Sequence, residues 1–342
     1  MRILFAGSPG IAVPALEALV GLGFSDPKFQ LVGVLSNPDK PRGRHGTPEP
    51  TEVAAAAALL SEQILQGGGP PLRILKPERL GAAVREAVAA LEPDLLVSFA
   101  YGRIFGPRFL SLFPRGGINI HPSLLPKYRG AAPIPAAILN RDRETGVTVQ
   151  RLAPEMDTGD ILLQESFFLT GRETTASLSD LAARKGADLL TEVLRSLARG
   201  GMTGRPQNHR AATYCSLITK EDGRIDWSRS AAEIDACIRA FTPWPLCFTR
   251  HGEQDLFILE GKAGEKYPGN YGPGKRGFCS SLENAGFFEP GKVLGIDKTR
   301  GILIQTGDGI LEVTRLQYRT KKALDWQSFL NGALGFTGSQ LR

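Results

Sequence analysis

The sequence is poor in the residues that build metal centres and disulfide frameworks. Its 342 residues include four cysteines and four histidines. No two cysteines are spaced as C-x-x-C, and the histidines lack the short spacings that bring two ligands together. We therefore expect no metal site, and we expect free thiols in a reducing compartment.

Long apolar runs are missing as well. No stretch reaches the roughly 20 residues that span a bilayer. Met1-Arg2 leads directly into the apolar run Ile3–Ala6, where a secretory signal would carry a longer hydrophobic region. These features predict a cytoplasmic bacterial protein without membrane contact.

Charge of either sign is not concentrated in one part of the chain. The net charge is +6 and the isoelectric point is about 9.2. A basic surface tolerates a phosphate-rich partner, but an imbalance of this size is also typical of a protein that is merely well dissolved. Charge alone therefore identifies no partner.

What the sequence does contain is an alternation of apolar strands and amphipathic helices over its first half. We expect strands at 2–6, 30–36, 72–75, 94–100, 117–121, 145–152 and 161–168. Helices are predicted between and after them, at 12–22, 51–65, 77–91, 107–112, 131–140 and 174–197. This order predicts an α/β fold with a Rossmann-like, mostly parallel sheet. The glycines after the first strand do not form G-x-G-x-x-G, which disfavours a dinucleotide site.

The pattern of strands and helices changes in the second half of the chain, which predicts a separate domain. A polar, aperiodic stretch at 199–212 reads as a linker between a catalytic domain, 1–198, and a C-terminal domain, 213–342. After one helix at 231–241, short strands are expected at 247–250, 256–259, 291–296, 301–305 and 310–316. Short strands with glycine turns favour a small OB-like β-barrel. Residues 267–290, rich in glycine and proline, are predicted to form a long loop.

The segment Gly117–Ile134 carries the clearest chemical signal. Asn119 and His121 alternate on the predicted strand and so share one of its faces. Pro122 biases His121 to an extended backbone and ends the strand there. Polar side chains at the carboxyl end of a strand lie where open α/β sheets bind ligands. The pair by itself would equally fit a capped strand end.

A carboxylate can join this pair from the connection that follows the strand at 145–152. Asp157 lies in an Asp-Thr-Gly-Asp run, which is also an ordinary turn sequence. If the two strands are neighbours, Asp157 can orient His121 and stabilise its protonated form, with Asn119 as a donor to a developing oxyanion. Ser123 lies past Pro122 and no G-x-S-x-G elbow is present. Direct transfer between two bound substrates therefore fits better than a covalent enzyme intermediate.

The same residues carry a family resemblance. The run Asn119-Ile-His121-Pro-Ser-Leu-Leu-Pro126, followed by Arg129-Gly130, resembles the signature of folate-dependent formyltransferases. Asp157, 36 residues after His121, matches that family's catalytic aspartate. The likeness covers nearly the whole chain through Phe5-Ala-Gly-Ser-Pro9, Pro38-Asp-Lys-Pro-Arg-Gly-Arg44, Glu144-Thr-Gly-Val-Thr148, Lys220-Glu-Asp-Gly-Arg-Ile-Asp-Trp227 and Ile238-Arg-Ala-Phe-Thr-Pro-Trp-Pro245.

The resemblance implies a donor, an acceptor and a set of site residues. It is closest to the branch that formylates the α-amine of methionyl initiator tRNA for translation initiation, with 10-formyltetrahydrofolate as donor. It implies that Asn119, His121 and Asp157 are catalytic and that the protein is a monomer. The implied folate-binding residues are Phe99, Ala100, Tyr101, Gly102, Ser123, Leu124, Leu125 and Pro126. Arg42, Arg44 and Lys220 are the implied tRNA-binding residues.

Other functions stay open at this point. A related formyltransferase acting on an amino sugar nucleotide can share the first-domain motif and a barrel-like second domain. A glycinamide ribonucleotide formyltransferase would leave residues 213–342 without a role. A tRNA-binding module with an inactive enzyme domain is disfavoured by the intact Asn119, His121 and Asp157. A nicotinamide oxidoreductase is disfavoured by the missing glycine fingerprint.

Overall fold

A computed structural model describes residues 1–41, 46–264 and 288–342. The chain forms two compact units. The first comprises Met1–Ile134, Glu144–Leu169 and Ser177–Ser216, and the second comprises Pro135–Arg143, Thr170–Ala176 and Leu217–Arg342. Residues 199–212, expected to be a linker, are thus packed within the first unit. The domain boundaries drawn from the sequence stay predictions.

The first unit is built on a seven-stranded sheet with the order β10-β9-β7-β6-β1-β2-β5. Five neighbouring strands are parallel, and β9 and β10 continue the sheet antiparallel. The strands are β1 (Arg2–Gly7), β2 (Gln30–Leu35), β5 (Arg73–Leu75), β6 (Leu95–Phe99), β7 (Gly117–His121), β9 (Glu144–Arg151) and β10 (Ile161–Phe168). Apolar side chains bury β6 throughout and β1 from Ile3 onward, as central parallel strands require. The predicted Rossmann-like, mostly parallel sheet is confirmed.

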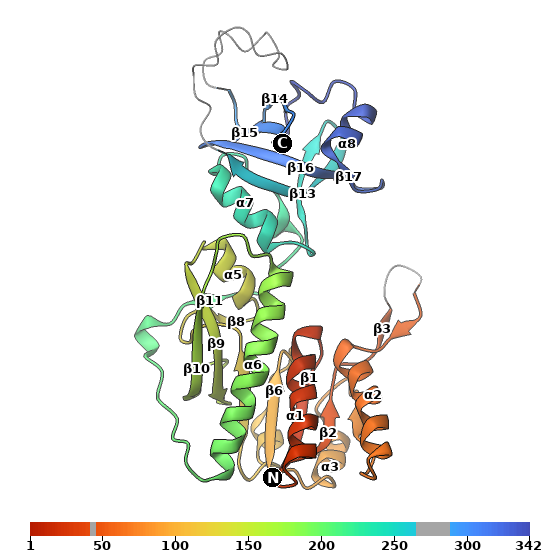
Figure 1. Ribbon diagram of the computed structural model, residues 1–342, viewed down its shortest axis with the longest axis vertical. Helices are drawn as coiled ribbons and strands as arrows, with labels where there is room; N and C mark the ends of the chain where they lie inside the picture. Colours follow the sequence, from red (N-terminus) through yellow and green to blue (C-terminus); the bar gives the residue numbers. More distant parts are fainter. Residues whose placement is uncertain (42–45, 265–287) are drawn as a thin grey trace. The chain divides into compact units, whose positions relative to one another are not determined.

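Helices cover both faces of this sheet (Figure 1). They are α1 (Val13–Ser25), α2 (Glu52–Gln66), α3 (Ala82–Ala89), α4 (Pro107–Leu110) and the long α6 (Thr175–Ala198). On one face α6 lies so close that a Cβ added at Gly186 would meet Ile120 at 2.9 Å. On the other face Leu4 and Leu96 pack with Val88 of α3 and Phe109 of α4. The alternating in-and-out pattern of each strand therefore serves two hydrophobic layers.

One predicted helix was wrong over its first turn. The pattern predicted a helix at 77–91, but α3 begins only after Gly81. Instead of helical partners, the carbonyl oxygens of Pro77 and Glu78 accept hydrogen bonds from the guanidinium of Arg103. That long-range contact replaces the bonds of a first helical turn. By contrast, the helix predicted at 51–65 forms as α2, which is capped by Thr51, whose hydroxyl accepts from the Ala54 N–H at 3.1 Å.

Short pairings that no periodicity predicts complete the first unit. β3 (Lys40–Pro41) and β4 (Pro48–Glu49) form an antiparallel pair. β8 (Arg129–Gly130) pairs in parallel with β11 (Tyr214–Cys215), which lies 85 residues further along. The second pairing fastens the segment after α6 to the loop that follows β7.

The second unit contains an antiparallel sheet with the order β12-β13-β16-β15-β14, to which β17 is added beside β16. Its strands are β12 (Cys247–His251), β13 (Gln254–Gly264), β14 (Val293–Asp297), β15 (Gly301–Gln305), β16 (Ile310–Tyr318) and β17 (Leu324–Asp325). α7 (Ala231–Ala240) begins at a capping box of Ser230 and Glu233, and α8 (Trp326–Gly332) follows β17. α5 (Pro133–Leu139) crosses the division between the units.

The last residues of the chain close this sheet. Gly338 and Ser339 exchange backbone hydrogen bonds with Val293 of β14, while Arg342 exchanges them with Arg250 of β12. The two edge strands are therefore joined through one short segment, which removes exposed edges. The small OB-like barrel expected from the sequence is confirmed. Of the predicted loop at 267–290, residues 267–287 lie outside the described part of the chain.

Candidate active site

The site lies at the carboxyl ends of β6 and β7, which are parallel neighbours. Phe99 of β6 pairs with Ile120 of β7, so the residues that follow both strands come to one edge of the sheet. On its other side, β7 pairs with β9 and sets Asn119 opposite Gln150. The expectation that the strand at 145–152 neighbours 117–121 is confirmed. Phe99–Gly102, His121 and Ser123–Pro126 thus share the edge where open α/β sheets bind ligands.

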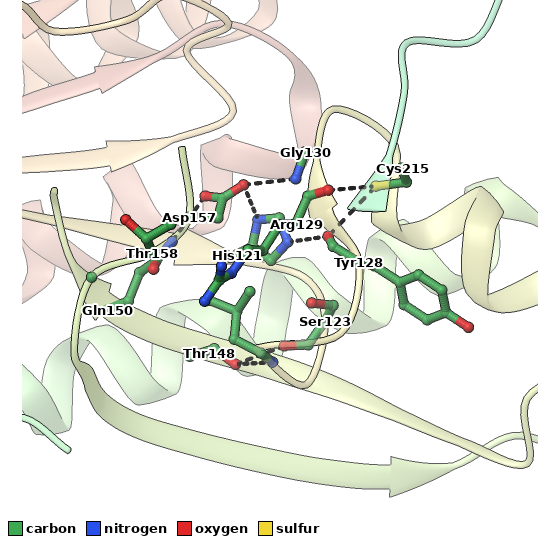
Figure 2. A network of polar contacts seen from close by, with 12 residues as sticks. His121, Ser123, Tyr128, Arg129, Gly130, Thr148, Gln150, Asp157, Thr158 and Cys215 are labelled. Carbon is green, nitrogen blue, oxygen red and sulfur yellow. Dashed lines mark hydrogen bonds and ion pairs between the residues drawn. The ribbon is translucent and has the colours of Figure 1, made fainter. Parts of the chain in front are cut away.

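His121 and Asp157 come together at this edge (Figure 2). The His121 Nδ1 and Asp157 Oδ2 atoms are 3.6 Å apart, and the imidazole is almost fully buried. The other ring nitrogen, Nε2, lies 2.8 Å from the carbonyl oxygen of Tyr128. Because a carbonyl only accepts, Nε2 carries a hydrogen and donates it. The nitrogen that faces the carboxylate is therefore Nδ1.

The Asp157 carboxylate is held by two further donors. Its Oδ2 accepts from the Gly130 N–H at 2.9 Å, and its Oδ1 accepts from Gln150 Nε2 at 2.9 Å. Asp157 has a left-handed backbone with φ of 57°, as have Tyr128 at 57° and Ala100 at 50°. Non-glycine residues adopt this region at a cost, and such residues concentrate at functional sites.

Asn119 differs from its neighbours because its amide is not engaged. Within residues 1–41, 46–264 and 288–342, no side-chain hydrogen bond of Asn119 is formed, and the residue is half-buried. Its N–H groups therefore remain available to a bound molecule. An amide donor at a strand end beside an imidazole and a carboxylate can stabilise an oxyanion while the other two handle a proton.

Ser123 is fully buried and its hydroxyl is occupied. The Oγ donates to the carbonyl oxygen of Lys127 at 2.6 Å. This contact keeps the hydroxyl away from any attacking role, in agreement with the missing nucleophile elbow. The serine instead shapes the loop that leads from His121 to Arg129.

The loop between His121 and Arg129 is anchored to β9 and β10 by side-chain hydrogen bonds. The buried Thr148 hydroxyl donates to the Ser123 carbonyl at 2.7 Å and accepts from the Leu125 N–H at 3.2 Å. Gln164 Nε2 donates to the Leu125 carbonyl at 3.0 Å. The predicted folate residues Ser123, Leu124, Leu125 and Pro126 therefore form a fixed wall beside His121.

The second group of predicted folate residues follows β6. Phe99 is fully buried, whereas Ala100 and Gly102 are exposed at the strand end. The Tyr101 ring turns into the hydrophobic core, where it stacks on Phe105 with centroids 5.3 Å apart, and its burial raises the pKa of the hydroxyl. A ligand at this edge can thus meet Ala100 and Gly102, whereas Tyr101 is buried and its carbonyl oxygen accepts from the Asn37 amide at 3.0 Å.

The predicted tRNA-binding residues are not tested by the described part of the chain. Arg42 and Arg44 lie outside the described residues. Lys220 is exposed in the second unit, where it precedes the 3-10 turn η3 (Glu221–Gly223). Their proposed role remains a prediction from the sequence.

Several residues around the site were given no role by sequence reasoning. Gln150, Gln207 and Arg129 are buried polar side chains that connect to Asp157 directly or through one another. Cys215 adds a contact to the same turn. Burial raises the pKa of its thiol, and the protonated thiol donates to the Tyr128 carbonyl oxygen at 3.5 Å. Signals existed for Gln150, a polar residue near the end of an apolar strand, and for Arg129, which belongs to the family signature, but none marked Gln207.

The described ranges contain neither a candidate metal centre nor a helix that could span a membrane. Three or more histidine, cysteine, aspartate or glutamate side chains do not gather into a candidate metal site there. Nor does any helix in those ranges have the length and apolar character that crossing a bilayer demands.

Comparison with known proteins assigns the chain. Residues 1–194 match the family model described as formyl transferase, and residues 217–334 match the model of the formyl transferase C-terminal domain. The chain belongs to the formyltransferase family. The expectation drawn from Asn119, His121 and Asp157 is thereby confirmed at the level of the family.

Relatives of this formyltransferase match it from end to end. A protein of Treponema denticola named methionyl-tRNA formyltransferase is 46% identical over 337 residues, covering 98% of each chain. One of the same name from Chloroflexus aurantiacus is 39% identical and covers 97% of each chain.

Solved structures share the fold of this formyltransferase at low identity. An N-formyltransferase of Helicobacter canadensis, crystallised with folinic acid and dTDP-3-aminofucose, superposes with a TM-score of 0.60 at 20% identity. The match covers 92% of this chain and 98% of that one. HypX of Aquifex aeolicus with tetrahydrofolic acid gives 0.59 at 18% identity, over 98% of this chain and 48% of that one.

Proposed function

We propose that this formyltransferase transfers the formyl group of 10-formyltetrahydrofolate to the α-amine of methionyl initiator tRNA. The observation that carries the proposal is the end-to-end likeness to proteins named methionyl-tRNA formyltransferase, at 46% identity over 98% of both chains. A likeness restricted to the first unit would leave the acceptor open. Here both units are matched, and the Asn119, His121 and Asp157 set is complete.

The reaction begins with a neutral amine. An α-amino group has an ordinary pKa of about 7.7–8.0, so part of it is unprotonated at neutral pH. The amine nitrogen attacks the formyl carbon on N10 of the folate and forms the new C–N bond. The carbonyl oxygen becomes an oxyanion, and the Asn119 amide donates to it. The C–N10 bond then breaks, leaving tetrahydrofolate and the formylated amine.

The proton lost by the amine goes to the Asp157–His121 pair and returns to N10 as the folate departs. His121 serves as a second donor to the oxyanion, as the family resemblance implies. In the geometry described above, its Nε2–H points to the Tyr128 carbonyl. To reach substrate, this hydrogen has to exchange the carbonyl oxygen for the substrate oxygen.

Substrate binding is divided between the strand ends and cationic side chains. Phe99–Gly102 and Ser123–Pro126 hold the folate, whose reactive end then lies beside His121. Arg42, Arg44 and Lys220 bind tRNA phosphates, which suits the net charge of +6. The enzyme acts in the cytoplasm as a monomer and without a metal.

The experiment that tests the function is formyl transfer with purified protein and 10-formyltetrahydrofolate. Charged initiator tRNA is expected to be formylated much faster than charged elongator methionine tRNA or an amino sugar nucleotide. Formylation of the sugar with none on the initiator tRNA would contradict the proposal. Equal rates on both tRNAs would keep the reaction but reject the initiator preference.

A further inference from the structure

The segment that follows α6 inserts one side chain behind the Asp157 turn. Gln207 is 5% exposed, and its Nε2 donates to the carbonyl oxygens of Asp157 at 2.8 Å and Gly159 at 2.7 Å. Its Oε1 accepts from Arg129 Nη2 at 2.7 Å and from Nε at 3.2 Å. Both ends of this amide are therefore fixed by groups on other segments.

The partners decide which way the amide points. A guanidinium only donates and a main-chain carbonyl only accepts, so the oxygen of Gln207 must face Arg129 and its nitrogen must face the turn. The orientation of Gln207 also fixes that of the neighbouring Gln150 amide. Gln150 Oε1 lies 3.2 Å from Gln207 Nε2, where it shares one of the two hydrogens that this nitrogen donates more closely to the two carbonyl oxygens. Gln150 Nε2 then faces Asp157 and donates to Oδ1 at 2.9 Å.

A buried arginine sets the orientation of these two amides. Arg129 is 1% exposed, and within the described ranges no carboxylate lies at ion-pair distance from its guanidinium. Its partners are the neutral Gln207, His209 Nδ1 at 3.1 Å and the Tyr214 hydroxyl at 3.3 Å. A buried charge needs oriented dipoles around it. The side-chain amides of Gln207 and Gln150 supply these dipoles. They lie in line between the Arg129 guanidinium and the Asp157 carboxylate, with each amide oxygen towards the positive charge and each nitrogen towards the negative one.

The segment carrying Gln207 is fastened on both sides of it. Arg205 exchanges backbone hydrogen bonds with Ile161 of β10. On the other side, Tyr214–Cys215 pair with Arg129–Gly130 as β11 and β8. The position of Gln207 is thus set by the first unit's own backbone and not by Asp157, which is what a support for a catalytic turn requires.

We propose that Gln207 is a positioning residue for the formyl transfer, and that it acts through Gln150 on the Asp157 carboxylate. The inference rests on the proposed function of Asp157 and His121. Gln207 donates to two carbonyl oxygens of the Asp157 turn and orients the Gln150 amide that donates to Asp157 Oδ1. The other carboxylate oxygen, Oδ2, therefore stays directed at His121 Nδ1. Without those donors only the Gly130 N–H still holds the carboxylate, so the carboxylate can rotate and the proton-transfer geometry is disturbed.

The discriminating variant is Gln207→Glu. A glutamate keeps an acceptor for Arg129 but cannot donate to the turn or to Gln150 when ionised. We expect kcat to fall by roughly 10²-fold, the order that a small misplacement of a reacting group costs, while both KM values stay within about twofold. The matched control is Gln305→Glu, which removes similar amide donors to Thr306 and Gly309 in the second unit and should leave kcat unchanged.

Two further measurements keep the inference falsifiable. Gln150→Met removes the donor to Asp157 Oδ1 and the acceptor that faces Gln207, while the bonds from Gln207 to the turn remain. This variant should also lower kcat, so it decides the matter if Gln207→Glu does not fold by circular dichroism. Nitrogen-15 shifts of the His121 ring should change in the Gln207 variant and not in the control. This readout holds even if the wild-type protein lacks transfer activity, which would overturn the proposed function alone. Wild-type kcat and unchanged His121 shifts in a folded Gln207→Glu protein would overturn the inference.

Discussion

At the scale of single residues, the site separates groups that are held from a group that is free to act. His121 and Asp157 have protein partners at every polar side-chain atom. The Asn119 amide, in the described part of the chain, has none. A preorganised pair next to an unengaged donor is what transition-state stabilisation requires, because the donor's interaction forms only when substrate is present.

This contrast predicts the effect of Asn119→Ala. If the amide is a principal oxyanion donor, its loss should cost about 2.7–4 kcal/mol of barrier, or about 10²- to 10³-fold in kcat, with little change in KM. Steady-state kinetics at saturating 10-formyltetrahydrofolate and charged tRNA measure it. Asn140→Ala, at an exposed position, is the control and should keep wild-type turnover. Unchanged kcat in the Asn119 variant would remove Asn119 from the mechanism.

At the scale of elements, the parallel pairing of β8 with β11 is the feature that assembles the site. It brings the Gly130 N–H to Asp157 and the Tyr128 carbonyl to His121 from a single short turn. Gly130 has a φ of 117°, and a Cβ there would lie 2.1 Å from the Cys215 carbonyl oxygen. Only glycine permits the two backbones to approach this closely.

Gly130→Ala should therefore separate β8 from β11. Backbone strain together with the clash is expected to lower the free energy of unfolding by about 3 kcal/mol. Gly116→Ala, which also has a positive φ but meets nothing within 4 Å, should cost only about 1 kcal/mol. Chemical denaturation of both variants gives the comparison. Equal destabilisation would mean that the close approach to Cys215 is unimportant.

The turn between β14 and β15 predicts an acid-sensitive contribution to the second unit. The Thr299 hydroxyl and N–H both donate to Asp297 and lower the pKa of that carboxyl from 3.8 to about 2. The pKa is depressed in the folded state, so the stabilisation is present above pH 3.8 and is lost as pH falls towards 2.

We expect the free energies of unfolding of the wild type and Asp297→Ala to converge as pH falls from about 5 to about 2.5. Thermal unfolding across this range measures the difference. Thr299→Val, which removes the hydroxyl donor and keeps the carboxyl, should behave intermediately. A constant difference between wild type and Asp297→Ala over the whole range would contradict the assignment.

At the scale of the whole molecule, the mild positive charge becomes meaningful once the acceptor is a nucleic acid. Each phosphate neutralised by a cation releases counterions and makes binding depend on salt. If Arg42, Arg44 and Lys220 contact three phosphates, the KM for charged tRNA should rise about 40-fold between 50 and 200 mM salt. The KM for the folate donor should change far less.

Arg44→Ala should then lower the slope of log KM against log salt by about one and raise the KM for tRNA, with folate affinity retained. Kinetics of the wild type and the variant at four salt concentrations test this. An unaltered slope would exclude a phosphate contact by Arg44, and an equal loss of folate affinity would indicate a general disturbance of the fold.

Much of this molecule follows from local sequence patterns. Period-two and helical patterns predicted β7, β9 and the long α6, because their buried faces are apolar and continuous. The run from Asn119 to Pro126 and the turn at Asp157 located the reacting groups and the family. The first turn predicted at Pro77 failed because a distant Arg103 competes for its carbonyls, which no local pattern contains.

The sequence by itself determined the fold class, the family and the identities of Asn119, His121 and Asp157, because those depend on periodic patterns and short runs of residues that are local in the chain. The tertiary structure alone decided how they are held. Gln207 reaches Asp157 across 50 residues of chain, and β11 reaches β8 across 85. Such pairings depend on long-range packing and on the direction of buried dipoles, and neither leaves a periodic trace in the sequence.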